Sequence, residues 1–417
     1  MIEEKPSTEL RALSIALVIR PFVGVIGGTE RVLVTLANGL VAKGHRVTVL
    51  HWDEQDGPAG FPLAPEVSQV NLRRPTVRWW SYLGLDRIQY WRVRHPIQWY
   101  AHNAPFRRAL VGWLQAHCPD VAIGFGPCAN TPLLLAARQT GVPAVASIHF
   151  TPEIDYSEKD RRIPKYELKR RLGALRHAAA THVLLPEYAD LFSADVTRKT
   201  IAIPNTVTPG ITRAVGRVPR RPVVLGLGRL EPLKNFADLV EAWARIADHH
   251  PAWTVEIHGE GELRTELEGL IAAHRLQGSC RLPGWAPDVP STLASATLFC
   301  LPSITEGFPL AALEALACGL PVVGYGDVPG LTAIVRHEEN GLLVSRSEGP
   351  AGLAAALDRL IRDEDLRRRL SAAAPASVAG YSEEAFLTRW LDLIGRVVNH
   401  RRVPRPAVEE PLGPFER

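Results

Sequence analysis

Short runs rich in Val, Ile and Leu alternate with helical patterns along almost the whole chain of 417 residues. Such alternation is typical of parallel α/β units, in which a helix follows each buried strand and covers the sheet. The pattern occurs twice and predicts two doubly wound, Rossmann-like parallel-sheet domains. In the first half the expected strands are 12–19, 45–51, 120–124, 143–149, 181–185 and 200–203. In the second half they are 223–227, 255–258, 297–301, 322–324 and 342–344.

A stretch between the halves, residues 206–222, is rich in Pro, Gly and Arg and has no apolar period, which indicates a linker. We therefore expect an N-terminal domain over 9–206 and a C-terminal domain over 207–381. A last helix, 382–400, has acidic residues in its first turn and is expected to bury an apolar face. That face carries Phe386, Trp390, Leu391 and Ile394. Residues 401–417 are Pro-rich and charged, so we expect a disordered tail.

Composition favours a soluble globular enzyme, with 46% hydrophobic and 22% charged residues. Five cysteines without a C-x-x-C pair argue against a disulfide framework or a zinc site and fit a reducing cytosol. The first residues are acidic, unlike a signal peptide, and no apolar run reaches the ~18 residues that cross a bilayer. We expect a cytoplasmic protein without a spanning segment.

Two carboxylates, Glu306 and Glu314, stand on either side of a Gly-Phe-Pro turn. Pro309 suits the first position of a helix, and Gly319 is placed to end it. The amides around Gly307 then lie at the positive end of that helix, where an anion is favoured. Carboxylates beside such amides suit a ligand that offers both phosphates and hydroxyls, as a nucleotide-sugar does.

Three further groups follow or end expected strands, where parallel sheets bind ligands. Arg229 and Lys234 flank glycines after the first strand of the second half, which suits a diphosphate. Gly27 and Gly28 follow the first strand of the chain and permit close approach of a ligand, although a tight turn is the alternative. His149 ends its strand and faces the same crevice, although a core histidine bonded to backbone is the alternative.

Three other patterns carry less weight. Asp363-Glu-Asp365 leads into a charged helix and predicts a helix start rather than a metal–diphosphate site. His337-Glu-Glu lacks the second histidine of a zinc motif. The dinucleotide-like run 124–129 contains Pro127, and no acidic residue ends a nearby strand. We expect no bound metal.

Taken together, the motifs resemble the retaining glycosyltransferases of the GT-B fold, family 4, also called glycosyl transferases group 1. The resemblance covers about residues 10 to 400, and the E-x7-E element is its most specific part. One segment departs from the family: Leu331-Thr-Ala-Ile-Val335 stands where many members have a Glu. The supporting elements are Gly228–Lys234, Ile203–Asn205, Asn340–Val344, Gly27–Glu30 and His149.

The resemblance implies roles for these residues. Arg229 and Lys234 would neutralise the donor diphosphate, and Glu314 would accept hydrogen bonds from the ribose hydroxyls. Glu306 and the following amides would hold the donor sugar, and His149 would contact the sugar or the acceptor. The implied catalytic residues are His149, Arg229, Lys234 and Glu306. The implied donor-binding residues are Gly28, Arg229, Lys234, Trp285, Glu306, Gly307, Phe308, Pro309, Leu310 and Glu314.

The resemblance also implies two domains that face each other across a cleft, with helix 382–400 packing back on the N-terminal domain. The activity it implies is transfer of a hexose from a UDP- or GDP-linked sugar to a hydroxyl of a glycan or lipid-linked acceptor, in the synthesis of envelope polysaccharide or glycolipid. Fixed cations at the leaving phosphate predict transfer with retention and without a metal or other cofactor. A sugar-nucleotide epimerase, a phosphorylase and a non-catalytic scaffold are the alternatives.

The first 210 residues hold 25 Lys and Arg against 18 Asp and Glu, and two segments concentrate this charge. Residues 73–108 contain eight arginines, one acid and four tryptophans, and residues 159–176 are also basic. Basic aromatic surfaces suit a membrane interface. We therefore expect peripheral contact with the inner face of the membrane, with a partly buried insert as the alternative and nucleic acid as a poorer fit.

Overall fold

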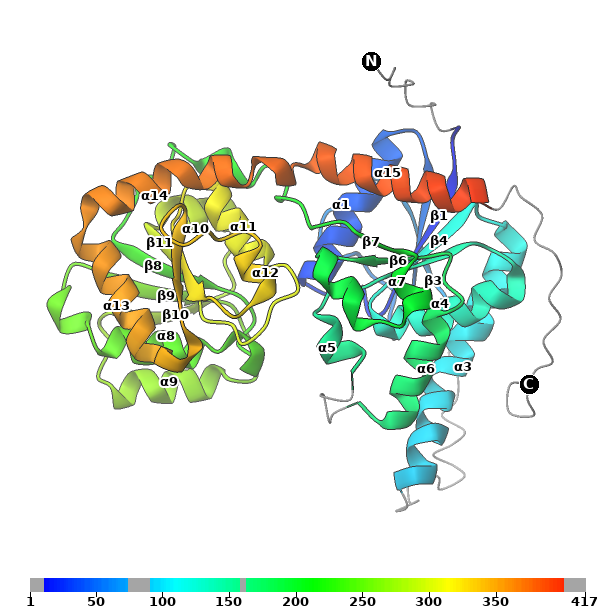
Figure 1. Cartoon of the computed structure of the whole chain (residues 1–417), viewed down its shortest axis with the longest axis horizontal. Coiled ribbons are helices and arrows are strands. Elements are labelled where there is room, and N and C mark those ends of the chain that lie inside the picture. The colour runs from blue at the N-terminus through cyan, green and yellow to red at the C-terminus, as the bar shows by residue number, and fades with distance from the viewer. Residues whose placement is uncertain (1–10, 74–90, 158–162, 401–417) are drawn as a thin grey trace.

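The chain folds into two lobes that lie side by side in the computed structural model (Figure 1). The structure describes residues 11–73, 91–157 and 163–400. The two basic segments, 73–108 and 159–176, lie partly outside these residues, and the expected tail 401–417 lies wholly outside them.

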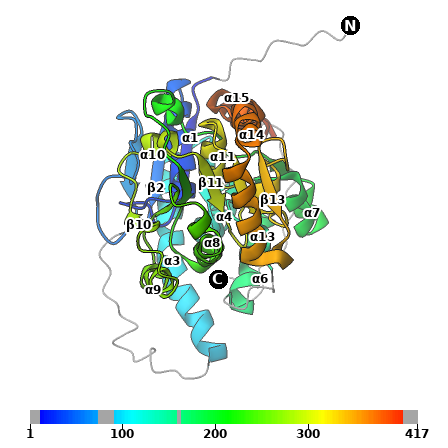
Figure 2. The same ribbon diagram turned by 90° about the vertical axis from the view of Figure 1, so that its left-hand side faces the viewer.

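The N-terminal lobe contains a sheet in which every strand is parallel to its neighbours. The order across the sheet is β3-β2-β1-β4-β5-β6-β7. The strands are β1 (Ser14–Ile19), β2 (Arg46–His51), β3 (Ser68–Asn71), β4 (Val121–Phe125), β5 (Ala144–Ser147), β6 (Ala180–Val183) and β7 (Thr200–Ala202). The helices of this lobe are α1 (Gly28–Ala42), α3 (Trp91–His117), α4 (Pro127–Thr140), α5 (Pro152–Asp155), α6 (Lys165–Leu175) and α7 (Ala194–Thr197). Both views show α3 extending well beyond the lobe (Figures 1 and 2).

The C-terminal lobe repeats the plan with a second parallel sheet, ordered β10-β9-β8-β11-β12-β13. Its strands are β8 (Val223–Leu227), β9 (Thr254–His258), β10 (Cys280–Gly284), β11 (Leu298–Leu301), β12 (Val322–Tyr325) and β13 (Gly341–Val344). Its helices are α8 (Phe236–Ala244), α9 (Arg264–Ala273), α10 (Val289–Ser295), α11 (Leu310–Ala317), α12 (Pro329–Thr332), α13 (Gly349–Arg362) and α14 (Glu364–Ser377). Two doubly wound sheets confirm the predicted fold class.

All the expected strands are present, with ends that shift by at most two residues, and two more strands form at sheet edges. The expected strand 143–149 ends at Ser147, so His149 follows the strand instead of ending it. Asp363 caps α14 by accepting a hydrogen bond from the amide of Leu366 at 2.8 Å, as expected for a helix start.

The strand order reverses between β1 and β4 in one sheet and between β8 and β11 in the other. At such a point the loops after neighbouring strands run in opposite directions and leave a crevice at the carboxyl ends of the strands. The loop that leads to α1 follows β1, and the loop with Arg229 follows β8. Each lobe therefore has a crevice ready to bind a ligand.

The last helix, α15 (Glu383–His400), crosses from the C-terminal lobe and lies on the N-terminal lobe (Figure 1). Trp390 and Ile394 are fully buried in the same core cluster as Leu33 of α1, whereas Leu391 is only partly buried. The approach to α1 is close: a Cβ on Gly39 would lie 2.4 Å from the side chain of Leu387. Glycine at position 39 thus permits the two helices to pack.

Candidate active site

A cavity of about 390 Å³ lies between the lobes and is lined by both. Every residue to which the sequence assigned a role lines it. These residues are Gly28, His149, Arg229, Lys234, Trp285, Glu306, Gly307, Phe308, Pro309, Leu310 and Glu314. Residues spread over almost three hundred positions of the chain thus surround one space, because the carboxyl ends of both sheets face it.

Lys234 and Glu306 form an ion pair at the C-terminal side of the cavity. The Lys234 Nζ lies 2.7 Å from the Glu306 Oε1, and the side chains are 22% and 10% exposed. Ser303 donates a second hydrogen bond to the same oxygen at 2.6 Å. The ammonium is therefore fixed beside a carboxylate and close to the start of α11, where both could contact a ligand that carries phosphates and hydroxyls.

Arg229 lies on the loop after β8 and is half exposed, with its Nη2 3.1 Å from the Glu231 Oε1. Across the cavity, burial raises the pKa of Glu30 in α1, while the positive charge of Arg229 opposes this shift. Arg229 therefore has room to turn toward a ligand and lies close enough to Glu30 for their charges to interact.

Glu314 is fully buried on α11, where its Oε1 accepts hydrogen bonds from two side chains of other elements. One donor is Arg31 of α1, whose Nη1 lies at 2.5 Å, and the other is the hydroxyl of Thr208. The Glu314 Oε2 is also buried and has no partner among the described residues. One carboxylate thus joins the two lobes and keeps a second oxygen available to a ligand.

The loop before α11 also contacts the N-terminal lobe directly. Tyr188 donates a hydrogen bond to the carbonyl oxygens of Glu306 and Gly307, at 3.2 and 3.1 Å. Asn205 donates to the carbonyl oxygen of Phe308 at 3.3 Å. A Cβ on Gly307 would lie 2.6 Å from the carbonyl oxygen of His149, which is shorter than real Cβ contacts. Only glycine fits at position 307 without moving one lobe.

Helix α11 begins one residue later than expected, at Leu310, because Pro309 is its N-cap with extended backbone dihedrals. Gly319, with a φ of 73°, follows the end of the helix as expected. The backbone of residues 307–310 therefore leads directly from the contact between the lobes into the amino end of α11.

His149 is 8% exposed and lines the cavity from the N-terminal lobe. Its Nε2 lies 2.7 Å from the Ser147 Oγ, so its partner is a side chain and not the backbone. Burial, with a smaller effect from His182, holds the pKa of His149 well below its usual 6.5. The imidazole is therefore neutral at neutral pH.

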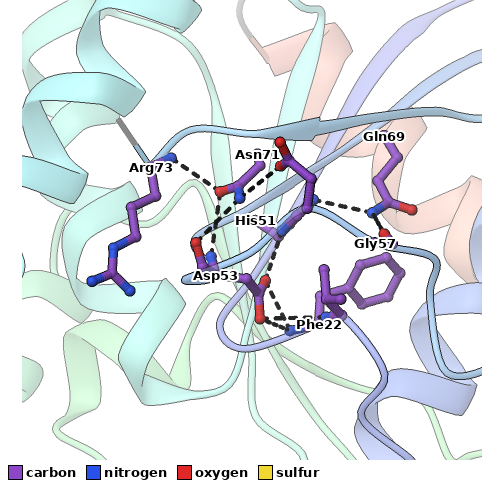
Figure 3. Close-up of polar contacts among 9 residues, drawn as sticks. Phe22, His51, Asp53, Gly57, Gln69, Asn71 and Arg73 are labelled. Atoms are coloured by element: carbon purple, nitrogen blue, oxygen red, sulfur yellow. Dashed lines mark hydrogen bonds and ion pairs between the residues drawn. The ribbon is translucent and has the colours of Figure 1, made fainter. Parts of the chain in front are cut away.

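A polar network fixes the loop that leads to Gly27 and Gly28 (Figure 3). The Asp53 carboxylate accepts hydrogen bonds from the amides of Phe22 and Val23, at 3.1 and 3.3 Å, and its Oδ2 lies 2.6 Å from the His51 Nδ1. Burial would raise the pKa of Asp53, but these hydrogen bonds together lower it. Asp53 is thus a carboxylate that holds the cavity-side loop against the end of β2.

Sequence reasoning missed Arg31, Thr208 and Ser303, although each contacts one of the two predicted carboxylates. No motif marks Arg31 or Thr208, because their partner Glu314 is distant in sequence. Ser303 lies within the same motif as Glu306, three positions before it, but the sequence alone gave it no role. His258 was detectable: it ends the expected strand 255–258 and lines the cavity.

Two features are absent from the described residues. No group of three or more His, Cys, Asp or Glu side chains in 11–73, 91–157 and 163–400 could hold a metal ion. Within the same ranges, every helix is too short or too polar to cross a membrane.

Comparison with known families shows which family the chain belongs to. Residues 26–210 match the family described as Glycosyltransferase Family 4, and residues 210–377 match the family described as Glycosyl transferases group 1. The two matches adjoin and cover both lobes. The chain belongs to the group 1 glycosyltransferases. The family indicated by its sequence motifs is thereby confirmed.

Curated members of the group 1 glycosyltransferases match parts of the chain. An uncharacterized glycosyltransferase of Haemophilus influenzae is 31% identical over 46% of the chain and 54% of its own length. The D-inositol 3-phosphate glycosyltransferase of Salinispora arenicola is 31% identical over 63% of the chain and 66% of its own length. The lipopolysaccharide core biosynthesis glycosyltransferase LpsE of Rhizobium meliloti is 33% identical over 42% and 49%. The chain thus spans about half to two thirds of these relatives.

A solved structure shares the arrangement of both lobes. Anabaena HepE, in complex with UDP and glucose, superposes with a TM-score of 0.69 at 18% identity over 91% of this chain and 99% of its own. At this identity the likeness establishes the fold, and the fold is GT-B.

Proposed function

We propose that this group 1 glycosyltransferase moves a hexose from a nucleotide-sugar, UDP- or GDP-linked, to a hydroxyl of a glycan or lipid-linked acceptor, with retention at the anomeric carbon. The observation that supports this most is the inter-lobe cavity, where Lys234 and Arg229 meet the carboxylates of Glu306 and Glu314 and the backbone of 307–310. The names of related proteins agree with it, since LpsE is a lipopolysaccharide core enzyme and HepE binds UDP and glucose.

The chemistry follows from the charges. Cleavage of the sugar–phosphate bond leaves negative charge on the diphosphate. Lys234, held by its ion pair, would stabilise this charge from a fixed position, and Arg229 would do so after turning toward the ligand. One such preorganised group is typically worth ~10²–10³ in rate. Because these cations belong to the protein, we propose that transfer needs no divalent metal. Glu306 would hold hydroxyls of the sugar, and the Glu314 Oε2 would accept from the ribose.

The test uses isotope-labelled UDP-, GDP- and ADP-sugars with the full-length protein, first in calorimetric binding and then in turnover with and without EDTA. The proposal expects binding of one donor class and EDTA-resistant transfer to an added acceptor, with the donor's anomeric configuration kept. An inverted product contradicts retention. Isomerised donor without an acceptor indicates an epimerase, and binding without any turnover indicates a scaffold. A protein that binds none of the donors contradicts the proposal as a whole.

We also propose that the protein acts in the cytoplasm at the inner face of the membrane, through the basic aromatic segments. Among the described side chains, Trp99 of α3 packs edge-on against Tyr166 of α6, and Arg170 lies 5.8 Å from the Trp99 ring. Tyr100 is half exposed beside them. Each cation near an anionic leaflet contributes ~1 kcal/mol. Flotation with anionic and with neutral vesicles tests this; protein that stays unbound in both contradicts it.

A further inference from the structure

A chain of hydrogen bonds runs from the cavity into the N-terminal lobe behind His149. The His149 Nε2 and the His182 Nδ1 each lie 2.7 Å from the same atom, the Ser147 Oγ. The His182 Nε2 lies 2.8 Å from the carbonyl oxygen of Ile203. The Nδ1 of His149 is buried and has no partner among the described residues.

Only one arrangement of protons satisfies all three of these hydrogen bonds when both imidazoles are neutral. The carbonyl of Ile203 can only accept, so the Nε2 of His182 carries its proton and the Nδ1 is a lone pair. The Ser147 hydroxyl must then donate to His182. Its oxygen is left to accept, and the group placed to donate to it is the Nε2–H of His149. The reverse order would set the lone pairs of the His182 Nε2 and the Ile203 oxygen against each other.

Water does not compete with these bonds, because aromatic rings enclose them. Ser147 and His182 are 0% and 1% exposed. The ring of Phe125 stacks on His149 at 5.1 Å, and Trp390 of α15 lies 4.6 Å from His182. Helix α15, which crosses back from the C-terminal lobe, thus covers these hydrogen-bonded side chains on the His182 side.

We infer that Ser147 and His182 are positioning residues, which hold His149 in the Nε2–H tautomer so that its bare Nδ1 is the hydrogen-bond acceptor offered to a ligand hydroxyl. This inference rests on the proposed function for its role, since the hydroxyl belongs to the sugar or the acceptor. The tautomer itself is a property of the unliganded protein. It specifies which ligand groups His149 accepts: hydrogen-bond donors such as hydroxyls, and not phosphate oxygens.

Long-range ¹H–¹⁵N spectra of ¹⁵N-histidine-labelled protein report the tautomer of each of the 14 histidines. Signals of His149 are assigned by their loss in His149→Gln. Wild type is expected to show the Nε2–H form of His149 alone. Ser147→Ala and His182→Leu are expected to give both tautomers, because only the imidazole's own preference then selects between them. His182→Gln keeps one donor and one acceptor and is the matched control, expected to retain the wild-type form.

An Nδ1–H form of His149 in the wild type overturns the inference, and so does an unchanged tautomer in Ser147→Ala. If His182→Leu does not fold, the Ser147→Ala spectrum decides alone. A donor-turnover assay on the same samples should show kcat/KM reduced about fivefold to tenfold in Ser147→Ala, the worth of one hydrogen bond. Correct spectra without any transfer in wild type would refute the proposed function and leave the tautomer assignment standing.

Discussion

The two lobes share one architecture, but the loops after their strands present different chemistry to the cavity. The C-terminal lobe offers charged groups held in pairs, Lys234 with Glu306 and Arg229 with Glu231. From the loop after β5, the N-terminal lobe offers a neutral, buried His149. The same crevice at the ends of parallel strands can therefore bind a diphosphate or a sugar hydroxyl, depending on which side chains follow the strands. The fold supplies the position, and a few residues supply the preference.

The largest expected effect is on the charged side. Lys234→Ala removes a cation from the leaving phosphate and leaves Glu306 without its ion-pair partner. We expect kcat/KM to fall by ~10²–10³. Lys43→Ala, at an exposed position after α1, is the matched control and should keep full activity. Unchanged kinetics in Lys234→Ala would show that charge on this lobe does not drive the reaction.

The next largest effect is expected at the contact between the lobes. Gly307→Ala places a Cβ where the His149 carbonyl lies, so the lobes must separate by a fraction of an ångström or more. Because a displacement of 1 Å can cost about 10²-fold in rate, we expect a loss of roughly 10- to 100-fold with the fold intact. Gly112→Ala, on α3 with open space around its Cβ, is the control. A fully active Gly307→Ala variant would mean that catalysis tolerates a different contact between the lobes.

Trp285 lines the cavity and is half exposed, which leaves a ring face open to a nucleotide base. Stacking of a base on an aromatic side chain is worth about 1–3 kcal/mol, so Trp285→Ala should raise the donor KM or Kd by roughly 5- to 100-fold. The control is Trp285→Phe, which keeps a ring and should lose less. If both variants bind donor as wild type does, the base lies elsewhere.

On the neutral side, acid stability is expected to depend on His182. Burial lowers the pKa of His182 from 6.5 to about 4. Above pH 6.5 both folded and unfolded states hold it neutral. As pH falls from 6.5 to about 4, only the unfolded state gains the proton, so the fold loses up to about 1.4 kcal/mol per pH unit from this residue.

His182→Gln should therefore flatten the loss of unfolding free energy between pH 6.5 and 4, measured by urea titration at each pH. An equally steep loss in the variant would show that His182 does not bind its proton preferentially in the unfolded state.

Sequence alone predicted the fold and where its ligands gather, because buried strands and the residues after them leave a local pattern. Strands β3 and β10 were not predicted, because Ser68–Asn71 is a polar edge strand and Cys280–Gly284 contains Pro and Gly. The contact of Arg31 with Glu314 was not predicted, because the two residues lie 283 positions apart. The hydrogen bond between Ser147 and His182 was not predicted for a similar reason, since the two residues lie 35 positions apart. Pairings between distant residues leave no periodic signal in one sequence.

We propose above all that Lys234 and Arg229 of the C-terminal lobe hold a diphosphate in the inter-lobe cavity. Calorimetry with UDP, GDP and ADP, each compared with its nucleoside, tests it most directly in wild type and in the Arg229→Ala/Lys234→Ala double variant. We expect wild type to bind one diphosphate at least tenfold more tightly than its nucleoside, and the double variant to lose this difference. Equal affinity of wild type and double variant for the diphosphate would contradict it.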